Sequence, residues 1–138
     1  MTTARDIMTP GADVLSPDTT VIEAAKKLAS EDYGSIPICD GDRLQGIVTD
    51  RDIVVKVLAA GKDPATTKVI DLTQDQGELV TIGADDPIEE ITRTMSEHQV
   101  RRLPVIDGKK LVGMVAQADL ARTGKDAKTG DTVEAISQ

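Results

Sequence analysis

The sequence predicts a mixed α/β (α+β) fold in which two copies of a β-α-β-β-α unit pack as one module with pseudo-two-fold symmetry. The main evidence is an internal repeat, because residues 18–52 align with residues 85–119 without a gap. Identical pairs include Pro37/Pro104, Gly46/Gly113 and Asp52/Asp119. A repeat of this length indicates two copies of one supersecondary unit. One copy is too small to bury much core, whereas two copies stacked together can do so.

The length of 138 residues suits one compact domain. We expect residues 1–66 to form the first repeat, 67–124 the second, and 125–138 a polar tail with one short helix at 132–136. The stretch 61–67 is the expected linker between the repeats.

Each repeat is expected to begin with a short extended piece, at 13–15 and at 79–82, followed by an amphipathic helix. In the first repeat, Thr20 with Glu23 fits a capping box, and in the second, Asp86, Pro87 and Glu89 predict a cap, a proline at the first helical position and a reciprocal carboxylate. Apolar residues at helical spacing then predict the buried faces: Val21, Ala24, Ala25 and Leu28, and Ile88, Ile91 and Met95.

A hairpin is predicted next in each repeat, since an Asp-Gly pair lies between two apolar runs. The strands are expected at 35–39 and 44–48, and at 102–106 and 111–115. Pro37 and Pro104 cannot donate in a ladder and are expected where the strand N–H faces outward. A second helix follows at 50–60, with Gly61 as its C-cap, and at 117–122 in the second repeat. Residues 74–77 are expected to form a polar turn.

Composition excludes several classes of function. Sixteen basic and 24 acidic residues give a net charge of −8, which repels DNA and does not favour anionic membranes. With Tyr33 as its one aromatic residue, the chain lacks stacking platforms for single-stranded nucleic acid. There is no apolar stretch typical of a signal peptide or a membrane span, and the lone Cys39 suits a reducing compartment. We therefore expect a cytoplasmic protein with neither nucleic acid nor membrane as partner.

No catalytic or metal-binding pattern is found. His98 and Cys39 make a poor zinc set, and Cys39 is expected to be a small apolar filler of the core. The chain has no P-loop, GxGxxG, EF-hand or Cys/His nucleophile arrangement. We expect no metal, no required cofactor and no enzymatic activity.

The pattern Thr49-x-x-Asp52 at the start of a helix has two interpretations. The helix N-terminus suits a phosphate, Thr49 can add a hydroxyl donor, and Asp52 can accept from both hydroxyls of a ribose. The same pattern is also a helix cap that needs no ligand. In the second repeat, Ala116 and Ala118 replace Thr49 and Arg51 whereas Asp119 remains, so a second site lacks the hydroxyl and a cation.

Two arginines lie beside this second candidate site. Arg101 and Arg102 occupy the places of Gly34 and Ser35, and strand alternation places their side chains on opposite sides. One of them can meet a phosphate through a charge-assisted contact. The alternative is a solvated or salt-bridged arginine on an acidic protein.

These residues carry a resemblance to a known family. The run Ile36-Pro37-Ile38, the Asp-Gly turn and residues 46–53 resemble a cystathionine-β-synthase (CBS) domain, as do Leu103-Pro104-Val105, the second Asp-Gly turn and residues 113–119. Asp6-Ile7-Met8-Thr9 resembles the usual opening of the family. The similarity covers about residues 4–122 and is greatest to small stand-alone CBS pairs (Bateman modules) of the hypoxic-response type.

The resemblance implies a regulatory module that binds an adenosine-containing ligand, such as AMP, ADP, ATP or S-adenosylmethionine, in the cleft between the repeats. It further implies energy or stress sensing, a homodimer and a separate effector protein. Carried over by position, the residues of a first site are Ser35, Ile36, Pro37, Thr49, Arg51 and Asp52. Those of a second, weaker site are Arg101, Arg102, Leu103, Pro104 and Asp119.

A rival hypothesis is a structural or interaction protein of the same fold with no physiological nucleotide, which the alanines at 116 and 118 favour.

The homodimer has modest physical support from the sequence itself. The helix at 50–60 is apolar nearly all round, and one face can cover its own sheet while the surplus needs another cover. The apolar residues are Ile53, Val54, Val55, Val57 and Leu58.

Overall fold

The computed structural model describes residues 1–11, 13–77 and 79–123, which include both helices and strands as predicted. The described residues form two compact units, one from 1–11 and 80–123 and the other from 13–77 with Leu79. The tail at 125–138 and the helix expected at 132–136 lie outside the described residues.

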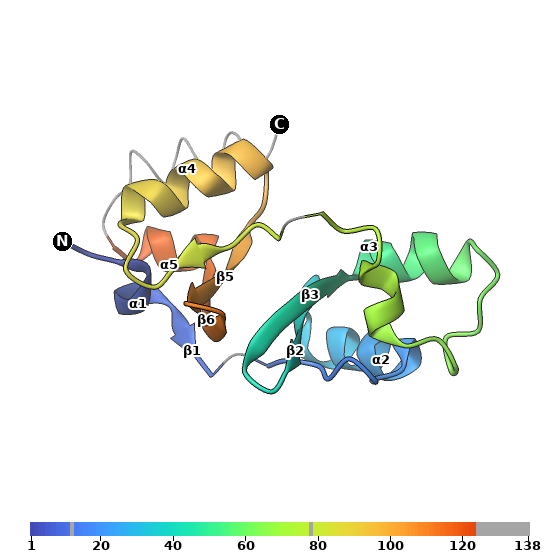
Figure 1. Ribbon diagram of the computed structural model, residues 1–138. Helices are drawn as coiled ribbons and strands as arrows, with labels where there is room; N and C mark the ends of the chain where they lie inside the picture. The colour runs from blue at the N-terminus through green and yellow to red at the C-terminus, as the bar shows by residue number, and fades with distance from the viewer. Residues whose placement is uncertain (12, 78, 124–138) are drawn as a thin grey trace. The chain divides into compact units, whose positions relative to one another are not determined.

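The unit formed by 13–77 is built on the hairpin of β2 (Ser35–Asp40) and β3 (Arg43–Thr49), as predicted (Figure 1). Gly41 has a φ of +65° in the turn, a conformation that glycine adopts without strain. Leu15 pairs in parallel with Ile38 on the other side of β2, through backbone bonds to Pro37 and Cys39. The carbonyl of Pro37 thus points away from β3, so the missing N–H of this proline is not needed in the hairpin.

Two helices cover one face of this hairpin. They are α2 (Val21–Glu31) and a second helix that begins as α3 (Asp50–Asp52) and continues as a π-helix, η1 (Ile53–Leu58). A short 3-10 helix, η2 (Val69–Thr73), completes the unit. The hairpin, α2, η1 and η2 all contribute to one buried cluster, which includes Val21, Leu28, Ile36, Val48, Val57 and Leu72.

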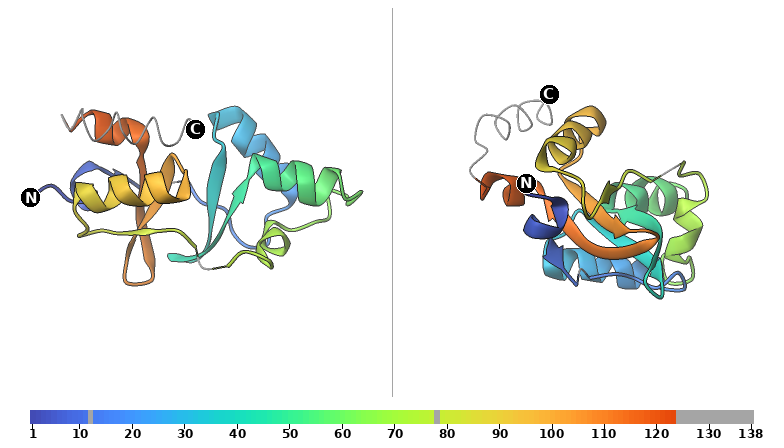
Figure 2. Two further views of the ribbon diagram at one scale, coloured as in Figure 1. Left: turned by 90° about the horizontal axis from the view of Figure 1, so that it is seen from above. Right: turned by 60° about the vertical axis from the view of Figure 1, so that its left-hand side comes forward.

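The second unit contains a sheet in the order β4 (Ile82–Gly83), β5 (Arg102–Asp107), β6 (Lys110–Ala116) and β1 (Thr9–Pro10). The β5–β6 hairpin matches the predicted one, and β4 joins β5 in parallel. Its helices are α1 (Ala4–Ile7), α4 (Ile88–His98) and α5 (Gln117–Ala121). The helix α4 lies along the sheet (Figure 2) and buries Ile88, Ile91 and Met95 against Leu103 and Val105.

The helix starts differ between the repeats. Thr20 caps α2 by accepting a hydrogen bond from the Glu23 N–H at 3.4 Å, which is one half of the predicted capping box. The predicted cap of α4 is wrong, because Pro87 is the extended N-cap residue rather than the first helical one. The Asp86 carboxylate turns back and accepts from the Gly83 N–H at 2.8 Å instead. The helix expected at 50–60 ends at Leu58, and Gly61 follows with a φ of +75°.

The compact units do not follow the division of the chain at residue 66. The backbone N–H of Ala4 donates to the Asp86 carbonyl at 2.9 Å, which ties the N-terminal segment to the second repeat. Likewise, the N–H of Val69 donates to the Thr19 carbonyl at 2.9 Å, which ties the segment before the second repeat to the first. Each repeat is therefore completed by the segment that precedes the other one in sequence.

Two aligned glycines allow these segments to approach. A Cβ atom on Gly113 would lie 2.6 Å from Met8 Sδ and 2.8 Å from the Thr9 carbonyl oxygen. A Cβ atom on Gly46 would lie 2.7 Å from Thr73 Cγ2. The Gly113 site is the stricter of the two, because its neighbours include backbone as well as a side chain.

We predict that Gly113→Ala destabilises the protein by about 1–3 kcal/mol, the range for overpacking a well-packed site. The strand β1 must shift to clear the new methyl group. Gly34→Ala is the matched control, since a Cβ atom on Gly34 meets nothing within 4 Å and its φ is not positive. Urea unfolding of both variants measures the difference, and equal midpoints would contradict the close packing of β1.

Candidate functional site

The first candidate site lies where β3 passes into the helix at Thr49. Thr49 is extended, with φ −115° and ψ 160°, and its Oγ1 accepts a hydrogen bond from the Asp52 N–H at 3.0 Å. The Asp52 Oδ2 in turn accepts from the Thr49 N–H at 3.0 Å. The capping interpretation of this pattern is therefore confirmed, because both halves of a capping box are present.

The hairpin brings a third predicted residue to this junction. Ser35 is directly opposite Thr49 in the β2–β3 register, so their side chains lie on the same face. The N–H of Asp50 donates to the Gly34 carbonyl at 3.1 Å and closes the hairpin at this end. Ser35, Thr49 and Asp52 thus lie together, whereas Arg51 is exposed on the first turn of the helix.

The remaining residues predicted for this site are held in the interior. Ile36 is 1% exposed and belongs to the core cluster, and Pro37 is also buried. Their side chains act on the site by fixing the position of β2.

The junction keeps free bonding capacity after its own cap is formed. A threonine hydroxyl that accepts one hydrogen bond still has its proton to donate, and a carboxylate has about four lone-pair sites. The Asp52 side chain is 18% exposed and can accept further donors. The N-terminal end of the helix adds a positive potential that favours an anion. This chemistry suits a ligand with both hydroxyl groups and a negative charge.

The second junction has the same backbone and a poorer set of side chains. Ala116 has φ −111° and ψ 161°, close to the values of Thr49, but offers no hydroxyl. Asp119 keeps the other half of the box, since its Oδ2 accepts from the Ala116 N–H at 2.7 Å. The cap is therefore half retained. Asp119 is 5% exposed and forms an ion pair with Arg122, which leaves little of its carboxylate for a ligand.

The arginines beside this junction differ in exposure. The carbonyl of Arg101 accepts from the Gln117 N–H at 2.8 Å, and its side chain is exposed. Arg102 is half-buried and lies opposite Ala116 in the register of β5 and β6. Leu103 is 1% exposed in the core, and Pro104 is buried. Arg102, rather than Arg101, therefore lies directly opposite the junction residue Ala116.

Sequence reasoning missed the contacts of Lys56. Its ammonium donates to Asp75 Oδ1 at 2.7 Å and to the Leu72 carbonyl at 2.9 Å, and it lies 3.5 Å from Asp52 Oδ1. The hydrogen bond to Asp75 raises the pKa of Lys56, and the same bond lowers the pKa of Asp75. The i,i+4 spacing of Asp52 and Lys56 was a readable signal. No such signal pointed to Asp75, because this residue lies in a separate turn.

The other candidate residues have structural surroundings. Cys39 is a buried free thiol whose pKa is raised by desolvation, as expected of a core filler. His98 is the last residue of α4 and is exposed. Across residues 1–11, 13–77 and 79–123, no three His, Cys, Asp or Glu side chains form a metal-binding group. Within the same residues, no helix has the length and apolar character needed to cross a membrane.

Comparison with known proteins identifies the family. The CBS domain family matches this chain twice, at residues 4–59 and 69–126, and the chain therefore belongs to that family. A relative, hypoxic response protein 1 of Mycobacterium tuberculosis, is 48% identical over 123 residues, which cover 88% of this chain and 85% of the relative.

Solved structures agree with this assignment. A crystal structure of hypoxic response protein I with two coordinated zinc ions has a TM-score of 0.79 and 48% identity, covering 89% of this chain and 99% of that one. CBSX2 in complex with AMP has a TM-score of 0.76 and 26% identity, covering 93% and 99%. The CBS pair of MJ0100 with 5′-methylthioadenosine and S-adenosyl-L-methionine has a TM-score of 0.72 and 28% identity, covering 92% and 98%.

A side-chain hydroxyl should stabilise the protein at either junction. Thr49→Ala should lower the free energy of unfolding by about 0.5–2 kcal/mol through loss of the cap, while Thr49→Ser should change it little. Ala116→Thr should raise it by up to about 1 kcal/mol, since the new hydroxyl can accept from the Asp119 N–H. Chemical unfolding without ligand measures all three. Loss of stability on Ala116→Thr would show that the second junction cannot take the same cap.

Proposed function

We propose that this protein is a non-catalytic regulatory module that binds an adenosine-containing nucleotide and senses energy or stress. The observation that carries the proposal is the junction of Ser35, Thr49 and Asp52, which places a hydroxyl donor and a carboxylate acceptor at the N-terminal end of a helix. The complexes of related CBS pairs with AMP and with S-adenosyl-L-methionine support it. The expected ligand is AMP, ADP, ATP or S-adenosylmethionine, recognised through its ribose and its charge.

The proposed roles of the residues are those that the family resemblance implies. The Asp52 carboxylate accepts from the ribose hydroxyls, and the Thr49 hydroxyl donates to a phosphate or to the charged tail of the ligand. Ser35 adds a second hydroxyl on the same face, and exposed Arg51 contributes positive charge. The second junction, with Ala116 and buried Asp119, is the weaker site, and Arg102 is its best cation.

The rival function is a structural CBS protein that binds no physiological nucleotide. Ala116 favours it at the second junction, and the complete capping box at Thr49 favours it at the first, since a satisfied cap needs no ligand. Direct binding measurements separate the two functions.

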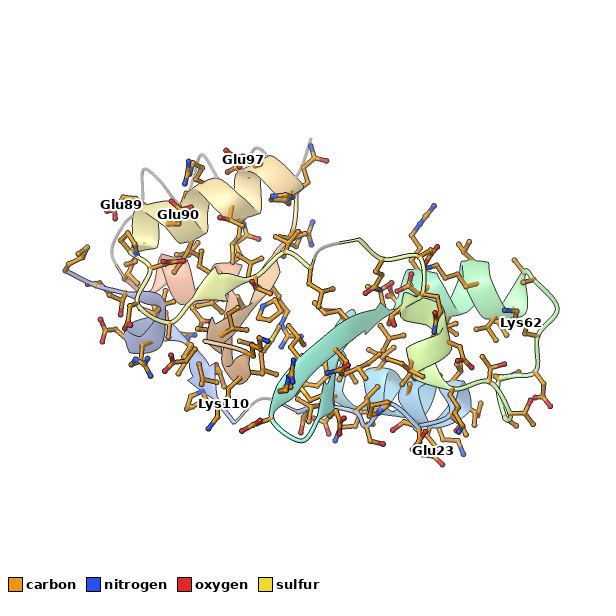
Figure 3. All side chains as sticks on the ribbon, in the orientation of Figure 1. Glu23, Lys62, Glu89, Glu90, Glu97 and Lys110 are labelled. Atoms are coloured by element: carbon orange, nitrogen blue, oxygen red, sulfur yellow. The ribbon has the colours of Figure 1, made fainter. Side chains whose placement is uncertain are left out.

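We also propose that the protein acts as a homodimer in the cytoplasm and signals through a separate effector protein. The described residues expose three large apolar side chains on η1: Val54 at 55%, Val55 at 48% and Leu58 at 57%. By contrast, α4 presents acidic side chains, with Glu89 and Glu97 exposed along it (Figure 3). A patch of apolar side chains on one helix is typical of a protein–protein contact.

The nucleotide proposal predicts saturable binding of AMP or ATP by calorimetry, with a rise in melting temperature. Asp52→Ala should weaken binding by about 1–3 kcal/mol, the range for losing hydrogen bonds to a charged group. Asp119→Ala should have a smaller effect, and equal effects would mean that the sites are ranked wrongly. Absence of binding by any of the four ligands would favour the structural function.

The dimer proposal predicts a dimer mass by light scattering at micromolar concentration. Leu58→Glu should shift the mass towards the monomer, because a charge cannot be buried unpaired in an apolar contact. Val14→Glu is the control, since Val14 is 42% exposed but lies outside η1. A monomer mass for the unmodified chain would refute the dimer.

A further inference from the structure

Lys56 links two parts of the first repeat that are distant in sequence. Its ammonium binds Asp75 and the Leu72 carbonyl in the segment 69–77, and it lies 3.5 Å from Asp52 Oδ1 at the candidate site. The Lys56 side chain is 28% exposed, and that of Asp52 18%, so the pair is partly shielded from water. An ammonium has three donors, and each of these three oxygens can take one.

The segment 69–77 is held to the repeat at further points. The Gln76 side-chain amide donates to the Ile47 carbonyl at 2.7 Å and accepts from the Ile47 N–H at 3.5 Å, as a neighbouring strand would. Thr73 packs over Gly46, and Val69 and Leu72 are buried. Lys56 is the contact that joins this segment to Asp52. Beyond residue 79 the chain continues into the other compact unit.

We propose that Lys56 couples the Asp52 carboxylate to the anchoring of the segment 69–77, so that engagement of Asp52 changes how firmly this segment is held. While Asp52 attracts the ammonium, the flexible Lys56 side chain is kept in the place from which it binds Asp75 and Leu72. When Asp52 no longer attracts the ammonium, the Lys56 side chain must lose more entropy to keep its contacts with Asp75 and Leu72. The segment then opens more often, and the opening lies next to the connection between the two units.

Among the residues that the structure describes, the second repeat lacks this connection. Thr123, which aligns with Lys56, donates its hydroxyl to the Leu120 carbonyl in the adjacent helix. Asp119 pairs with Arg122, three residues along the chain, so this ion pair is local. The coupling is therefore a property of the first repeat and makes its junction the regulatory one. In this respect the inference rests on the proposed function, but the coupling itself can be tested without a ligand.

The test is hydrogen exchange of the full chain, followed by mass spectrometry. Asp52→Asn keeps an acceptor for the Thr49 N–H but removes the charge. It should speed exchange of the amides at 71–77 by about two- to fivefold, as expected for loss of a partly exposed ion pair. In a Lys56→Met background, exchange at 71–77 should already be faster, and Asp52→Asn should add nothing. Lys56→Gln provides a second background should Lys56→Met fold poorly.

Three controls make the result decisive. Asp119→Asn should leave the amides at 2–10 unchanged, and Lys68→Met removes an exposed pair with Asp18 that does not reach Asp52. Amides of α2 report global opening. The proposal is overturned if Asp52→Asn leaves 71–77 unchanged, if its effect is equal in both Lys56 backgrounds, or if α2 speeds up equally.

A second arm uses AMP at a saturating concentration set by calorimetry. Bound AMP should alter exchange at 71–77 in the unmodified chain but not in Lys56→Met, and an equal change in both would count against the coupling. If AMP does not bind, the proposed function fails for this ligand, while the Asp52→Asn comparison still decides whether Lys56 couples the two regions.

Discussion

The close approach of a segment from elsewhere in the chain to one edge of each hairpin is the constraint on which the rest of this structure depends. Gly113 lets Met8 and Thr9 lie against β6, and Gly46 lets Thr73 lie against β3. Each segment also supplies a buried residue, Ala4 in one unit and Val69 in the other, to the core beside the hairpin. Because the N-terminal segment completes the unit that contains β5 and β6, that unit is not a continuous stretch of chain, whereas the unit formed by 13–77 with Leu79 is continuous.

The two strand–helix junctions share this arrangement but have different properties. Their backbones are nearly identical at Thr49 and Ala116, so the difference in side chains alone separates them. The first junction has a complete capping box with capacity left for a ligand, whereas the second has a buried carboxylate occupied by Ala116 and Arg122. A duplicated fold has thus kept its geometry in both copies but concentrated polar chemistry in one.

The first repeat also carries the other features to which we assign a function. These are the exposed apolar side chains of η1 and the Lys56 contacts with the segment 69–77. Ligand recognition, association with a second chain and response to binding are therefore proposed for one compact unit. The second repeat, with a polar α4 and a local Asp119–Arg122 pair, serves mainly as a framework in this interpretation.

The sequence by itself determined the repeat, the two hairpins, the cap at Thr49 and the family, because each depends on turn residues, apolar periodicity or a motif within a few positions. The expected cap at Asp86 failed because its carboxylate found the Gly83 N–H, a competing local partner. Only the tertiary structure decided which segment completes which repeat, that Ile36 and Leu103 are core residues, and that Lys56 meets Asp75. These outcomes depend on packing between residues far apart in the chain, and no local pattern encodes such contacts.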